Sequence, residues 1–187
     1  MRLARLSVAL LILGACGNPE KSEAVRLAKV LQQQQTAMNE VNSREPELFA
    51  GMKQWSAMVA FLGGSGAGGN PAQRAQRYAS NVQNGKDQVA LIRGVLENEQ
   101  LEFARTQTIR TNLVESLTRR EAYLSEVGRN LERSARDFPR LGLFSYPQSI
   151  AELNQQLETY SPPTEVVSEA LQNLRMQYDI TDQDLAN

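Results

Sequence analysis

The chain has 187 residues, of which 41% are apolar and 22% charged, with 20 basic against 21 acidic side chains, one cysteine and no histidine. These numbers fit one compact domain or an elongated helical rod, and they exclude a disordered tail, a disulfide scaffold and a multi-domain enzyme. The lack of histidine removes triads and dyads with an imidazole base, and the single cysteine removes thiolate zinc sites. We therefore expect no enzymatic activity, no metal site and no cofactor.

The first residues have the three-part layout of a secretory signal peptide. Arg2 and Arg5 lie in a short basic segment, an apolar run extends from Leu6 to Leu13, and small residues follow. This run is too short to cross about 30 Å of hydrocarbon as a stable helix. We expect residues 1–15 to be removed as a signal peptide.

The cleavage region, Leu13-Gly14-Ala15-Cys16, resembles the lipobox of bacterial lipoproteins, in which lipoprotein signal peptidase cuts the bond before the cysteine. The resemblance implies that Cys16 becomes the first mature residue and carries a diacylglycerol thioether, usually with a further N-acyl chain such as palmitate. Two or three acyl chains would hold the protein on one membrane almost irreversibly. The alternatives are a chance cysteine at the end of an ordinary signal peptide and a free cysteine in a short membrane anchor.

The residue after the cysteine bears on location. Lipoproteins that lack Asp at this position usually move to the outer membrane of bacteria with two membranes, and here the residue is Gly17. The resemblance therefore implies a periplasm-facing outer-membrane protein, or one on the outer face of the cytoplasmic membrane in a bacterium with a single membrane. Residues 16–187 carry 18 basic and 21 acidic side chains, a net charge of −3 that argues against a nucleic-acid partner.

Residues 16–18 would form a short tether, after which the spacing of apolar residues predicts a helix over 19–62. Asn18 and Pro19 provide an N-cap and a first helical residue, and apolar residues then recur every three or four positions to the end of this helix. Pro46 falls inside the run without changing its register, which predicts a kink or a short break.

A glycine-rich segment follows at 63–70. It contains Gly64-x-Gly66-x-x-Gly69, which formally matches the dinucleotide fingerprint. That fingerprint carries chemistry only between a strand and a helix, whereas a helix is predicted on each side here. We interpret the segment as a hairpin linker, with Pro71 as the first residue of the next helix.

One heptad register extends over the next predicted helix, 71–138. Its a positions are Val82, Val89, Leu96, Phe103, Arg110, Leu117, Leu124, Leu131 and Phe138. Several d positions are polar, which favours a bundle over a self-sufficient two-stranded coil. Glu45, Glu99, Arg110 and Arg120 occupy seam positions, where we expect structural pairing across the bundle and where a proton or ion site is the alternative.

The length of this helix conflicts with the lipid anchor. If 19–62 and 71–138 form a straight hairpin, the second helix extends about 32–38 Å past Asn18, towards the membrane. A rod that lies flat or tilted, unwinding after Asn18, or a break of the long helix would resolve the conflict. A break is favoured near 104–112 by three threonines, whereas the preserved heptad register favours continuity, so both remain open.

An acidic cluster, Glu97-x-Glu99-x-x-Glu102, could serve acid–base chemistry or bind a metal. On a continuous helix, however, Glu99, Glu102 and Arg105 lie one turn apart. A solvated charge network then explains the cluster without any site.

The turn at 138–147 concentrates large apolar side chains between prolines. They are candidates for a partner contact: Phe138, Leu141, Leu143, Phe144 and Tyr146. They either plug the end of the bundle or form an exposed knob that touches a partner or a membrane. Helices are predicted beyond this turn at 148–160 and 162–178.

The predicted fold is all-α: a single helical domain over 19–187, arranged as an elongated antiparallel bundle or coiled-coil-like hairpin with three to four long helices. A lipid-anchored tether, adaptor or accessory subunit that contacts proteins or itself through helices is the leading functional hypothesis. The alternative is an envelope carrier of a small apolar ligand or lipid. The anchor and heptads resemble those of murein lipoprotein, but Asn187 stands where that family has the Lys joined to peptidoglycan, so covalent wall attachment is not expected.

Overall fold

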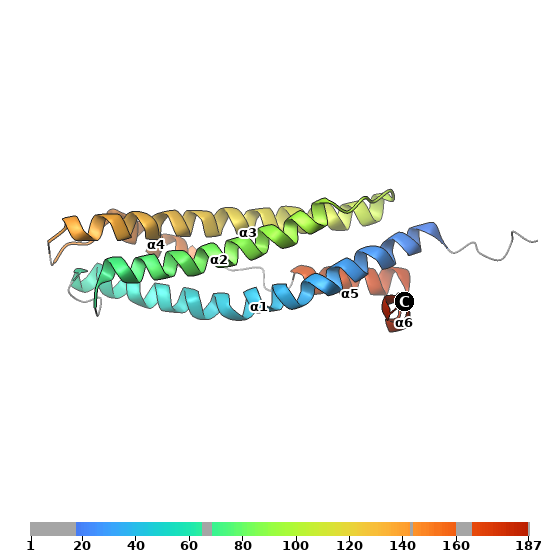
Figure 1. The fold of residues 1–187 in the computed structure, drawn as a ribbon, viewed down its shortest axis with the longest axis horizontal. Helices are drawn as coiled ribbons and strands as arrows, with labels where there is room; N and C mark the ends of the chain where they lie inside the picture. Colours follow the sequence, from blue (N-terminus) through green and yellow to red (C-terminus); the bar gives the residue numbers. More distant parts are fainter. Residues whose placement is uncertain (1–17, 65–68, 143, 160–165, 187) are drawn as a thin grey trace, which may run out of the picture.

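The computed structural model describes residues 18–64, 69–142, 144–159 and 166–186, and all regular structure among them is helical, which confirms the all-α fold class. Three long helices lie side by side: α1 (Pro19–Leu62), α2 (Pro71–Glu97) and α3 (Ala104–Asp137). The shorter elements are η2 (Phe138–Arg140), α4 (Gln148–Thr159), α5 (Val166–Tyr178) and α6 (Asp182–Ala186). Together they form an elongated bundle (Figure 1).

The helices follow one another up and down the bundle. α2 packs mainly on α3, whereas α4 packs on α1 and α3, and α5 packs mainly on α1. Helices α4 and α5 therefore occupy the fourth position of the bundle in series, each covering part of its length (Figure 1). The 44 residues of α1 give the bundle a length of about 66 Å.

The starts of the first two long helices are set by local capping. The Asn18 side chain accepts a hydrogen bond from the backbone N–H of Glu20 at 3.0 Å, and Pro19 is the first residue of α1. The Asn70 side chain likewise accepts a hydrogen bond from the backbone N–H of Ala72 at 3.0 Å, and Pro71 is the first residue of α2. A proline at this position loses nothing, because its missing N–H would have had no partner within the helix.

Helix α1 continues without a break across Pro46. Its axis bends gently near the middle of the helix (Figure 1). A proline inside a helix removes one backbone hydrogen bond and displaces the preceding turn, which accounts for a bend here.

The long helix predicted over 71–138 is interrupted. α2 ends at Glu97 and α3 begins at Ala104, so the interruption lies at 98–103 rather than near 104–112. The predicted location was wrong because Thr106 supports the start of α3: its hydroxyl donates to the carbonyl of Phe103 at 2.8 Å. Threonine competes for backbone hydrogen bonds and is therefore better suited to a helix start than to an interior.

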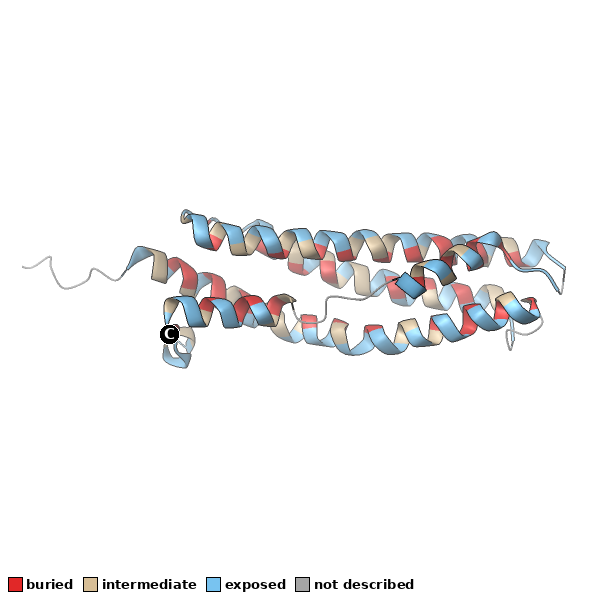
Figure 2. Ribbon diagram, turned by 180° about the vertical axis from the view of Figure 1, so that it is seen from behind, coloured by how far each residue is buried: buried red, intermediate tan, exposed pale blue. Residues whose placement is uncertain are grey.

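The core extends along the whole bundle, and Figure 2 shows buried residues recurring along the helices. It includes Leu27 and Leu31 near the start of α1, and Trp55 and Val59 near its end. Buried apolar residues recur every three or four positions, so each helix turns one face inward.

Candidate functional site: the two ends of the bundle

The N-terminal end of the bundle joins the start of α1 to the C-terminal helices (Figure 1). The Tyr178 hydroxyl donates to the Glu20 carboxylate at 2.7 Å, and the Lys21 ammonium donates to the carbonyl of Asp179 at 2.8 Å. Burial, together with the hydrogen bond to Glu20, raises the pKa of Tyr178 to about 12. The beginning and the end of the described chain are thus held together at one end of the molecule.

Glu23 of α1 connects this end to the interruption between α2 and α3. Its carboxylate accepts hydrogen bonds from the backbone N–H groups of Glu102 at 2.7 Å and Phe103 at 3.1 Å, and from the hydroxyl of Thr106. Burial alone would raise the pKa of Glu23, but these hydrogen bonds and the nearby charge of Arg26 lower it. Glu23 is therefore a carboxylate that binds, from another helix, the two residues just before α3 and the hydroxyl of Thr106 in its first turn.

The acidic cluster does not lie on one helix as expected. Glu97 is the last residue of α2, whereas Glu99 and Glu102 belong to the connection that follows. Glu97 pairs with Arg93 at 2.7 Å, and the Glu99 carboxylate lies 3.8 Å from Arg26. Within residues 18–64, 69–142, 144–159 and 166–186, no group of three Asp, Glu, Cys or His side chains is placed to hold a metal ion.

Two of the charged seam residues meet inside the bundle. The Glu45 carboxylate of α1 pairs with the guanidinium of Arg120 of α3, and both side chains are almost fully buried. Arg120 also donates to the Asn42 side-chain oxygen at 2.9 Å. The other two seam residues, Glu99 and Arg110, are joined through the backbone: Arg110 donates to the carbonyl of Glu99 at 2.6 Å.

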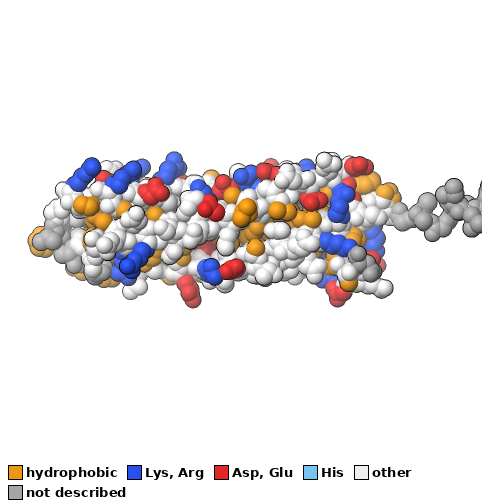
Figure 3. All heavy atoms as spheres, in the orientation of Figure 1, with side chains coloured by type: hydrophobic (Ala, Val, Ile, Leu, Met, Phe, Trp, Pro, Cys, Tyr) orange, Lys and Arg blue, Asp and Glu red, His pale blue; other side chains and the backbone are white. Residues whose placement is uncertain are grey.

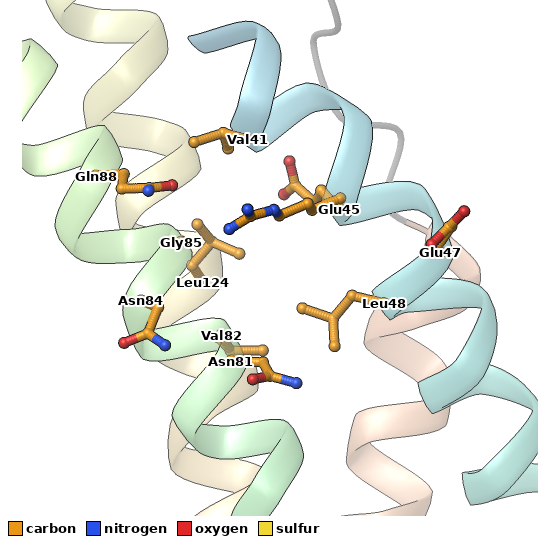
Figure 4. Close-up of a pocket in the computed structure, with 11 residues that line it drawn as sticks. Val41, Glu45, Glu47, Leu48, Asn81, Val82, Asn84, Gly85, Gln88 and Leu124 are labelled. Carbon is orange, nitrogen blue, oxygen red and sulfur yellow. The ribbon is translucent and has the colours of Figure 1, made fainter. Parts of the chain in front are cut away.

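A cleft of about 400 Å³ lies beside this ion pair, between α1 and α2 (Figure 4). Val41 and Leu48 of α1 face Val82 of α2 and Leu124 of α3, and Gly85 leaves room between them (Figure 4). The rest of its lining is polar or charged: Arg44, Glu45, Glu47, Asn81, Asn84 and Gln88.

The opposite end of the bundle, called the distal end below, carries the α1–α2 and α3–α4 connections. It is defined by residues 56–64, 69–78, 133–142 and 144–152. The backbone N–H of Gly64 donates to the carbonyl of Ser145 at 3.3 Å, which joins the two connections. This end therefore forms one surface from two separate turns.

The candidate contact residues of the α3–α4 turn divide into two groups. Phe138 is only 7% exposed and packs against Trp55, with ring centroids 6.2 Å apart, so it plugs the bundle and is not available to a partner. Phe144 is 86% exposed, and Leu141 and Tyr146 are also exposed. Leu143 lies outside the described residues.

Three exposed apolar residues at the distal end were not predicted from the sequence: Met58, Phe61 and Leu62, at the end of α1. Phe61 is as exposed as Phe144. The signal that could have identified it is its position two residues before the glycine-rich segment, where α1 ends and no neighbouring helix continues to cover it.

The distal end is basic. It contains five exposed arginines and two acidic residues, a net charge of +3, whereas the remaining described residues carry 13 basic and 18 acidic side chains, a net charge of −5. The charged residues of the distal end are Arg74, Arg77, Arg133, Arg136, Arg140, Asp137 and Glu152. In the view of Figure 3, basic side chains lie over this end, and others lie near the opposite end among acidic ones.

Leu13, Gly14, Ala15 and Cys16, the lipobox-like residues, lie outside the described residues, as does Gly66 of the glycine-rich segment. In the part of the chain that the structure describes, no helix combines the length and the apolarity needed to cross a bilayer. Comparison with models of known families, with curated proteins and with solved structures found no match.

Proposed function

We propose that this protein is a lipid-anchored tether or adaptor of the bacterial cell envelope, held to a membrane through Cys16 and making its second contact through the distal end. The observation that carries the proposal is that the two ends of the rod differ: one end lies next to Cys16 in the sequence, and the other exposes apolar side chains. Asn18, two residues after Cys16, caps the start of α1, and the exposed apolar residues lie about 66 Å away at the other end of this helix.

The interruption of the long helix supports an upright anchor. Arg26, near the start of α1, donates to the backbone carbonyl of Gln100, so the α2–α3 connection lies level with the first turns of α1. The extension of about 32–38 Å expected from a straight helix is therefore missing. A bundle standing on Cys16 would turn this connection, rather than a long helix, towards the membrane.

The packing of the interior favours a tether over a carrier. A carrier of an apolar ligand needs a vacant apolar chamber. The cleft of about 400 Å³ between α1 and α2 has a mixed lining, in which four apolar side chains stand beside the buried ion pair and several amide groups. A second cleft of about 520 Å³ is lined mainly by charged and amide side chains of α3 and α4. Side chains such as Leu27, Leu31 and Trp55 fill the inward positions instead.

The anchor is tested by substituting the proposed acylation site. Cys16→Ser should abolish incorporation of labelled palmitate and block cleavage of the signal peptide, whereas Gly17→Ala should change neither. In a host with two membranes, Gly17→Asp should move the protein from the outer-membrane fraction to the cytoplasmic-membrane fraction. Palmitate incorporation that persists in Cys16→Ser would contradict the proposal.

The second contact is tested by site-specific photo-crosslinking in cells. A photoreactive side chain in place of Phe61 or Phe144 should give adducts, with protein or with lipid. The same group in place of Leu91 or Met176, which are 71% and 74% exposed but lie outside the distal end, should give few. Equal adduct yields at all four positions would argue against a distal contact.

A further inference from the structure

The distal end carries most of the exposed large apolar side chains of the described chain. Six of nine lie there: Met58, Phe61, Leu62, Leu141, Phe144 and Tyr146. Phe61 and Phe144, each 86% exposed, come from different turns that the hydrogen bond between Gly64 and Ser145 joins. An apolar cluster of this kind on an otherwise polar surface marks a contact site.

The charge around this cluster selects an anionic partner. Arg136 and Arg140 are exposed and flank the α3–α4 turn, and Arg74 and Arg77 lie in the first two turns of α2. Arg133 pairs with Glu152 at 3.0 Å, and Glu132 lines a shallow hollow together with Arg136, so the five arginines of this end outnumber the three acids near them, Glu132, Asp137 and Glu152. The rest of the described chain is acidic and would be repelled by a negatively charged surface, which would leave the distal end as the favourable point of approach.

The size of the distal end favours a lipid surface over a protein. Four helices of about 10–12 Å diameter have a combined cross-section of roughly 300–450 Å², which is small beside the accessible surface of about 800 Å² that a standard protein interface buries on each partner. Insertion into a membrane interface needs only a few projecting apolar side chains, with cations close enough to reach the phosphates. The two phenylalanines and their neighbouring arginines meet both requirements.

We propose that the distal end binds an anionic phospholipid surface, with Phe61 and Phe144 entering the boundary between headgroups and acyl chains and the arginines contacting lipid phosphates. The inference rests on the proposed function, because it identifies the second contact of the tether. A lipid-anchored protein with such an end would connect two lipid surfaces, one through Cys16 and the other through these side chains.

The test uses residues 18–187, which contain every core side chain of the bundle but lack Cys16. This protein is floated with vesicles of phosphatidylcholine alone and with vesicles containing about 30% phosphatidylglycerol. It should partition at least about tenfold more strongly into the anionic vesicles, because several arginines close to such a surface each strengthen the attraction to it. Raising the salt concentration should weaken this binding.

Paired variants identify the binding surface. Phe61→Ser/Phe144→Ser should lower partitioning into anionic vesicles at least about tenfold, since two large apolar side chains are lost. Leu91→Ser/Met176→Ser removes two equally accessible apolar side chains from other faces and should leave partitioning within about twofold of wild type. Circular dichroism verifies that both variants are folded.

Three results of the flotation experiment would overturn the inference: wild-type protein that does not float with anionic vesicles, equal partitioning into both vesicle types, or equal losses in the two paired variants. A dimer in analytical ultracentrifugation that Phe61→Ser/Phe144→Ser dissolves would assign the distal end to a second copy. Distal adducts with a protein and none with lipid would likewise refute lipid binding but leave the tether intact. Because this fragment lacks Cys16, the flotation result is independent of the anchor.

Discussion

The Glu23 carboxylate accepts a hydrogen bond from the backbone N–H of Phe103 at 3.1 Å, although 80 residues separate the two in the chain. Phe103 is the N-cap residue of α3, and its own side chain provides no capping hydrogen bond. A residue of α1 therefore binds the N-cap residue of α3 and, through the N–H of Glu102, the residue before it. This long-range contact, called the Glu23 cap below, holds the α2–α3 connection against the first turns of α1.

Glu23→Gln should lower the free energy of unfolding by about 1–3 kcal/mol. The charged acceptor of three hydrogen bonds is replaced by a neutral amide, whose NH₂ group faces one of the two backbone N–H donors in either orientation. Urea denaturation followed by circular dichroism measures the change. Glu40→Gln, which removes only an exposed pair with Arg44 on the same helix, is the matched control and should cost less than about 0.5 kcal/mol. Equal effects of the two substitutions would contradict the cap.

Through the Glu23 carboxylate, the stability of the protein should depend on pH. The pKa of Glu23 is lowered in the folded protein from its ordinary value of 4.5, because its hydrogen bonds outweigh the effect of burial. The contribution of Glu23 is therefore complete above pH 4.5 and is lost as the pH falls through the lowered pKa. In a pH series of urea denaturations, the stability difference between wild type and Glu23→Gln should shrink below pH 4.5. A stability difference that grows below pH 4.5 would contradict a lowered pKa of Glu23 in the folded protein.

Removing one partner of the buried ion pair should lower the stability of the protein strongly, whereas replacing both partners with apolar side chains should lower it little. Glu45→Ala removes the counter-charge of the buried Arg120 guanidinium, which should destabilise the protein by about 3–5 kcal/mol. Glu45→Leu/Arg120→Met should recover most of this loss in the same denaturation experiment. Arg133→Gln, which breaks the exposed pair with Glu152, should cost less than about 1 kcal/mol. A double variant as unstable as Glu45→Ala would show that the charges themselves are required.

Truncation of the two phenylalanines of the α3–α4 turn should have very different effects on stability. Phe138→Ala opens a cavity beside Trp55 and should cost about 3–5 kcal/mol, whereas Phe144→Ala should change stability by less than about 0.5 kcal/mol. Trp55 is the single tryptophan of the chain, so its fluorescence spectrum should change in Phe138→Ala and not in Phe144→Ala. Similar costs for both substitutions would mean that the turn packs differently.

Much of the fold followed from local pattern. The 3.6-residue period and the Asn-Pro pair at 18–19 predicted the α1 helix, and Pro71 predicted the start of α2, because capping and periodicity depend on neighbouring residues. The candidate contact turn was also located from its composition. The exposure of Phe61 was missed, because a helix-end residue follows the same spacing whether or not a neighbouring helix covers it.

By itself, the sequence determined the all-α fold class, the caps of the first two helices and the exclusion of chemistry that needs histidine, because these depend only on residue types and their spacing. The tertiary structure decided where the long helix is interrupted, which phenylalanine of the turn is buried and where the basic and apolar side chains gather. The heptad register continues through 98–103, and the stabilising acceptor at the start of α3 comes from Glu23 on a different helix. Likewise, Trp55 covers Phe138, while Phe144 lies beyond the ends of the helices that would bury it.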